Sequence, residues 1–266
     1  MTMRTHTLAR CGILSLIAVA TSVQAQSLAA RVSAAGNGSV NFHFTARPGV
    51  CGDGLRYMRI GRSYQGAWSS DMRSAPCTVG PVQVRLTLRD GGVDRLESWA
   101  GTLRMREGRD LGEVSSAESA RYLLDIAAHG GAGASTKAIL PAVLADSSTV
   151  WPTLLVIARD TETRSHATRQ DAAFWLSRFA ATALAGKDHE LLDDDADDGR
   201  DGGGTKDLKR HAVFVLSQLP NHDGVPALLD IARSNPDRTI RGHALFWLGQ
   251  SGDPRALALF ESLLRA

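Results

Sequence analysis

Three stretches of the chain repeat the same order of apolar and polar positions. They begin 40 and 32 residues apart and span residues 169–177, 209–217 and 241–249. Each reads as a basic residue, two spacers, Ala, a spacer, Phe, a bulky apolar residue, Leu and a small residue. A helical pattern that recurs at this period predicts a stack of paired helices, an α-solenoid.

A second recurring pattern supplies the other helix of each pair. Residues 152–158 match residues 226–232, and residues 254–260 follow more loosely; each segment begins with Pro. Proline suits the first helical position, where no N–H is needed. This alternation resembles HEAT-like repeats of the bilin-lyase type over about residues 149–266. The resemblance implies that each second helix lines a concave surface, and it does not extend to bilin-lyase activity.

Helical periodicity separates a core face from a second face in the repeated helices. The predicted core positions are Ala172, Trp175, Leu176 and Phe179, then Ala212, Val215, Leu216 and Leu219, then Ala244, Trp247 and Leu248. The repeated Phe lies about 200° from the motif Ala at roughly 100° per residue. Either these Phe side chains pack between repeats or under the β-rich part, or they form an aromatic partner-binding ribbon. The candidate binding residues are Phe174, Arg178, Phe214, Gln218, Phe246 and Gln250.

The part that precedes the repeats, residues 26–112, has a β-rich pattern. Apolar and polar residues alternate in residues 40–44 and 82–88, and a Gly-rich turn and residues 93–99 complete a predicted hairpin. A helix predicted from Ser115 to His129 and a short one over 137–145 form a connector and cap, residues 113–148. The predicted fold class is multidomain α+β, a small β-rich N-terminal domain followed by an all-α HEAT-like solenoid, residues 149–266.

The first 25 residues have the layout of a secretory signal peptide. Arg4 and Arg10 precede a largely apolar run to Val23, and small residues around Ala25 suit cleavage. We therefore expect a periplasmic or extracellular protein. Beyond the signal, only Cys51 and Cys77 remain, which in an oxidising compartment predicts one disulfide. Two buried free thiols are the alternative.

An acidic insertion, at about residues 187–205, replaces most of the first helix of the second repeat. Asp193, Asp195 and Asp197 are spaced like EF-hand ligands, but Asp198 takes the place of the turn glycine and Gly204 that of the bidentate Glu. We predict a disordered insertion, with calcium binding as the alternative.

Charge is split between the two parts of the chain. Residues 26–112 hold 12 Arg, no Lys and 7 acidic residues, whereas residues 113–266 hold 16 basic and 21 acidic residues. The net charges of +5 and −5 cancel, and a neutral exported protein is not expected to bind nucleic acid.

No catalytic or metal-binding set emerges from the sequence. His211 and His243 occupy the same repeat position, which Asp171 takes in the first repeat, so a structural role is expected for them. His189-Glu190 is the lone His-Glu pair, and the metal site of the HEAT-like deoxyhypusine hydroxylases is therefore not expected. We predict no cofactor.

The predicted function is that of an exported, monomeric scaffold that binds another protein or peptide through its concave surface and is not embedded in a membrane. The alternative is an enzyme or enzyme subunit, lyase-like or hydroxylase-like, that acts in the cleft between the two parts.

Overall fold

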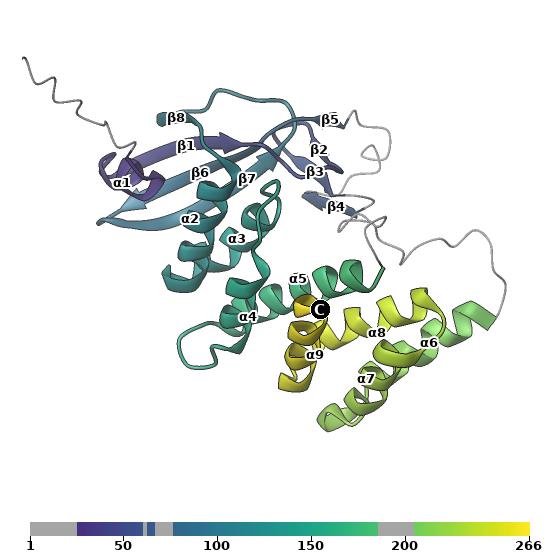
Figure 1. Ribbon diagram of the computed structural model, residues 1–266. Helices are drawn as coiled ribbons and strands as arrows, with labels where there is room; N and C mark the ends of the chain where they lie inside the picture. Colours follow the sequence, from purple (N-terminus) through teal and green to yellow (C-terminus); the bar gives the residue numbers. More distant parts are fainter. Residues whose placement is uncertain (1–25, 61–62, 67–76, 186–204) are drawn as a thin grey trace, which may run out of the picture.

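The computed structural model describes residues 26–60, 63–66, 77–185 and 205–266, which form two β-sheets and an array of helices (Figure 1). The predicted signal peptide and almost all of the predicted acidic insertion lie outside these residues. None of the described helices is both long and apolar enough to cross a bilayer.

The first sheet contains the predicted hairpin and has the strand order β7-β6-β1-β8. Its strands are β1 (Gly38–Phe44), β6 (Val82–Arg89), β7 (Gly92–Ala100) and β8 (Arg109–Glu113). β6 pairs with β7 and with β1 in antiparallel fashion, whereas β8 is parallel to β1. Alternation of apolar and polar residues buries Phe42, Val84 and Leu86, which confirms the strand predictions.

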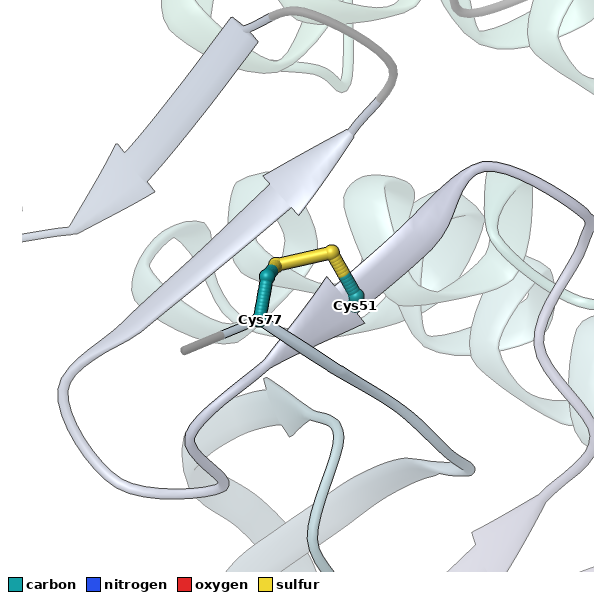
Figure 2. Close-up of a disulfide and its surroundings, with 2 residues drawn as sticks. All are labelled: Cys51 and Cys77. Atoms are coloured by element: carbon teal, nitrogen blue, oxygen red, sulfur yellow. A yellow bond between two sulfur atoms is a disulfide. The ribbon is translucent and has the colours of Figure 1, made fainter. Parts of the chain in front are cut away.

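The second sheet is smaller and carries the disulfide. Its order is β4-β3-β2-β5, from β2 (Val50–Gly52), β3 (Tyr57–Ile60), β4 (Ser63–Gly66) and β5 (Thr78–Val79). Cys51 on β2 is bonded to Cys77, just before β5 (Figure 2). The predicted bridge is therefore present and ties the ends of two short neighbouring strands together.

Helices α1 (Leu28–Ser33), α2 (Ser116–His129) and α3 (Ala132–Val143) lie next to the first sheet (Figure 1). α2 begins where the sequence predicts, because the Ser115 hydroxyl accepts a hydrogen bond from the Glu118 N–H. α3 starts at Ala132, before the predicted Lys137, and contains Pro141. Helix α3 contacts strand β7, so the connector joins the sheet to the helices that follow.

The remaining helices continue the array in two layers. They are α4 (Trp151–Arg159), α5 (His166–Ala185), α6 (Thr205–Ser217), α7 (Val225–Ser234), α8 (Arg238–Ser251) and α9 (Pro254–Arg265), with a 3-10 turn η3 (Pro220–His222). One layer runs α3, α5, α8, α6 and the other α2, α4, α9, α7 (Figure 1). The helices are therefore not stacked in the order of the chain.

This order corrects the expected consecutive repeats. α8 lies beside α5, and α9 lies beside α4, where the Arg159 guanidinium and the Glu261 carboxylate are 2.7 Å apart. The next described helices, α6 and α7, lie at the far end of the array, and α8 and α9 lie between them and the α4–α5 pair. The small last residue of the repeat motif explains the α5–α8 contact, because a Cβ on Gly249 would lie 2.7 Å from the Ser177 side chain.

The predicted core face of α6 is also wrong. Ala212 and Val215, together with Leu219 just beyond the end of α6, are exposed, and Val213 is the buried residue among those of α6 whose burial the structure describes. Because α6 ends its layer, its main neighbours among the described helices are α7 and α8. The periodic apolar pattern thus marks a face that no described helix covers.

Candidate functional site

An aromatic row crosses three helices of one layer, α5, α8 and α6. Its rings contact one another in sequence, with centroid separations of 5.2, 6.1, 5.0, 5.1 and 6.1 Å. In spatial order the members of this row are Trp175, Phe174, Phe246, Trp247, Phe214 and His211. The three predicted Phe residues therefore belong to one aromatic feature, which crosses helices that are not consecutive in the chain.

The row differs from the predicted ribbon in its order and its burial. Phe246, not Phe214, contacts Phe174, and Trp247 is inserted before Phe214. Phe174, Phe246 and Trp247 are all half-buried, so Trp247, a predicted core residue, falls in the same burial class as the two Phe residues. The packing of Phe174 on Phe246 holds α5 and α8 together, in keeping with the alternative that the Phe side chains pack between helices.

The α6 end of the row is the accessible end. Phe214 is 38% exposed, and Val215 and Leu219, which follow it in the chain, are 46% and 40% exposed. Large apolar side chains gathered on a surface mark contact sites for other macromolecules. We refer to Phe214, Val215 and Leu219 as the α6 patch.

The three polar candidates flank the aromatic residues on the same helices. Gln218 is exposed on the α6 side, and its amide donates to the Ser217 hydroxyl at 3.0 Å. Arg178 and Gln250 are half-buried. These side chains could donate hydrogen bonds to a partner protein beside the rings. Most of the binding energy of such an interface would come from the aromatic side chains.

The repeat position shared by Asp171, His211 and His243 has three different environments. His211 is exposed against Phe214, and His243 is half-buried. Asp171 is half-buried, and burial raises the pKa of its carboxyl to about 6. A common structural role of this position stays a prediction, and Asp171 stands out as the acidic residue of the three.

Asp171 lies at a cavity that the sequence did not reveal. The cavity has a volume of about 410 Å³ and lies between β7, α3 and α5; it is lined by Leu96, Glu97, Ser98, Trp99, Thr136, Lys137, Leu140 and Asp171. No sequence motif joins these residues, because the strand, the connector helix and the first long repeat helix meet only in the folded chain. The unusual Asp at a position that holds His in the other repeats was the one available signal.

Arginines gather on the outer face of the sheet near this cavity. The Arg106 guanidinium lies 3.5 Å from the Trp99 ring centroid. Burial lowers the pKa of Arg106. The positive charges of Arg85 and Arg104 lower this pKa further, whereas the negative charge of Glu97 raises it. Glu97 thus has cationic neighbours on the sheet, whereas burial is the sole cause of the raised pKa of Asp171.

The described residues contain no group of three His, Cys, Asp or Glu side chains placed to hold a metal ion. Ligand sites in proteins combine apolar side chains with a few polar groups, and the lining of this cavity has both.

The family model of HEAT repeats matches residues 202–266. This segment includes α6 to α9, and the match confirms the HEAT-like resemblance for that part of the chain. No curated protein and no solved structure is significantly similar to the chain.

Proposed function

We propose that the chain is an exported, non-enzymatic interaction protein that binds another protein through the α6 patch and the adjoining end of the aromatic row. HEAT repeats generally mediate protein interactions, and the matched segment includes the helix that carries the patch. The observation that carries the proposal is the accessible apolar group of Phe214, Val215 and Leu219 at the end of a helical layer.

The composition of the patch fits a protein partner. Aromatic side chains supply large contact areas with few rotamers to fix, and they dominate binding energies at protein interfaces. Phe214 is anchored on one side by the Trp247 ring at 5.1 Å, so little side-chain freedom remains to be lost on binding. The half-buried members of the row then support Phe214 and do not contact the partner themselves.

A charge substitution tests this surface. Phe214→Asp should abolish capture of a stoichiometric partner from the envelope fraction of the native cell, because an unpaired carboxylate would be buried in the contact. Val156→Asp is the matched control, since Val156 is 66% exposed on α4. Loss of the partner with both variants, or with neither, would refute the patch as the binding surface.

Export is tested independently of binding. The mass of the protein recovered from the native cell should correspond to a chain that starts at Gln26, which follows the expected cleavage after Ala25. A cytoplasmic protein that retains Met1 would contradict export and leave the binding result unaffected.

A further inference from the structure

Strand β7 presents unpaired main-chain groups at the edge of the first sheet. The Gly101 N–H donates to the Pro81 carbonyl at 3.2 Å on the β6 side, whereas the Ala100 carbonyl accepts from the Gly54 N–H at 3.0 Å on the opposite side. Main-chain groups alternate in direction along an antiparallel strand. The N–H and C=O of Ser98 and Leu96 therefore also point away from β6.

The pairing of β7 with β6 supports this assignment. Its register is regular from Leu96 to Ala100, and the shift occurs beyond Arg95. Among the described residues, no hydrogen bond engages the outward groups of Leu96 or Ser98. A strand edge of this kind is a ready template for pairing with another extended chain.

The outward-facing residues Leu96 and Ser98 also line the cavity of about 410 Å³. Residues 96–99 of β7 form one wall, and Thr136, Lys137 and Leu140 of α3 form another. An exposed strand edge is where several recognition domains add a peptide as a further strand. The volume lies within the range of ordinary ligand sites, about 300–1,000 Å³.

The charges of the groove define the side chain that it would accept. Asp171 makes no hydrogen bond or ion pair within the described parts of the chain. Lys137 is exposed, and Glu97, the other carboxylate of the groove, interacts with Arg106 on the outer face. A half-buried carboxylate that lacks a cation is unfavourable until one is supplied. An Arg or Lys side chain from a ligand would supply it.

We propose that the groove between β7, α3 and α5 binds an extended segment of a partner protein, which adds to β7 as a strand and places an Arg or Lys side chain at Asp171. This site goes beyond the proposed α6 patch, because it is formed by other elements. A peptide can bind here even if the patch binds nothing.

Synthetic peptides test the proposal without knowledge of the partner. The probes are blocked decapeptides of alternating Thr and Val with a central Lys or a central Glu. The Lys peptide should bind the full chain at least about tenfold more tightly than the Glu peptide, a difference of about 1.4 kcal/mol. Asp171→Asn should remove this preference, and the Lys peptide should slow hydrogen exchange at the Leu96 and Ser98 amides. Failure of the Lys peptide to bind at about 1 mM would overturn the proposal.

The main chain of β7 provides a second test. Ser98→Pro removes an N–H that points to the groove and leaves the bonds to β6 in place, because proline is accepted at a strand edge. This variant should lose peptide binding, whereas Ser98→Ala, which retains the N–H, should keep it. Equal binding by two folded variants would overturn strand addition. Concentration-dependent dimerisation that Ser98→Pro abolishes would also overturn it, in favour of a second copy of the chain as the occupant.

Discussion

Removal of the Asp171 charge should stabilise the protein, whereas most substitutions lower the free energy of unfolding. Burial raises the pKa of this carboxyl from 3.8 to about 6, so the folded chain holds the proton more tightly than the unfolded chain. Above pH 6 the folded chain must carry a half-buried negative charge, and its free energy of unfolding is reduced. As the pH falls from 6 toward 4, the folded chain takes up the proton first and this penalty disappears.

The size of the effect follows from the shift. Each pKa unit is worth about 1.4 kcal/mol, and a shift of roughly two units sets an upper limit near 3 kcal/mol. Asp171 is only half-buried, and solvent screening reduces this limit to about 1–2 kcal/mol. Asp171→Asn should therefore raise the free energy of unfolding by that amount at pH 7.5 and leave it nearly unchanged at pH 4.

Urea unfolding followed by tryptophan fluorescence at both pH values measures this difference. Other carboxylates titrate in the same range, so the quantity of interest is the wild-type curve minus the variant curve. Asp230→Asn, at an exposed position on α7, is the control and should give a flat difference. A destabilised Asp171→Asn variant at pH 7.5 would refute the reasoning, because it would mean that a cation such as Lys137 already stabilises the carboxylate.

Four further variants test the packing. Gly249→Val should destabilise by about 1–3 kcal/mol in thermal melts through overpacking, whereas Gly242→Ala on the same helix has open space and should stabilise by about 0.5–1 kcal/mol. Asp253→Ala should cost about 1–2 kcal/mol of unfolding free energy, because the Asp253 carboxylate caps α9. Hydrogen bonds from Arg255 hold the pKa of Asp253 far below its usual range. The stabilisation by this carboxylate should therefore persist at pH 5 and be lost only in strong acid. Cys51→Ser with Cys77→Ser should cost about 3 kcal/mol in urea unfolding, since the bridge closes a separation of 26 residues. Equal melts for the two glycine variants, an unchanged Asp253→Ala variant, or an unaffected double serine variant would each contradict the corresponding packing argument.

Local features of the fold were predictable because short-range rules decide them. The alternation in residues 82–88, the Ser115 cap and the two-cysteine count led to β6, α2 and the disulfide. Each depends on residues that are close in sequence or on a count that leaves one pairing. The repeated helices were recognised for the same reason.

The order of the helices was not predictable from periodicity. The same motif that packs α5 against α8 would also pack α5 against α6, because Ser177, Ser217 and Gly249 are all small. Only the folded chain distinguishes these contacts. The error on α6 has the same origin, since Val215 follows the core pattern although its helix is at the end of a layer.

The candidate sites divide in the same way. Phe174, Phe214 and Phe246 were identifiable by repetition, but the insertion of Trp247 between two of them depends on the order of the helices. The groove was missed, because Ser98 and Asp171 are brought together by β7, α3 and α5. Sequence spacing carries no signal for a site of this kind.

The C-terminal helices return to the middle of the array, which places α9 beside α4. The Arg159–Glu261 ion pair, at 2.7 Å, is the contact that reports it. In the variant Arg159→Lys, a carbodiimide should couple the introduced amine to the Glu261 carboxylate, and mass spectrometry of the digest should recover the linked peptides. Adding Glu261→Gln should abolish the link. Absence of the link in folded Arg159→Lys protein would contradict the arrangement and favour helices stacked in the order of the chain.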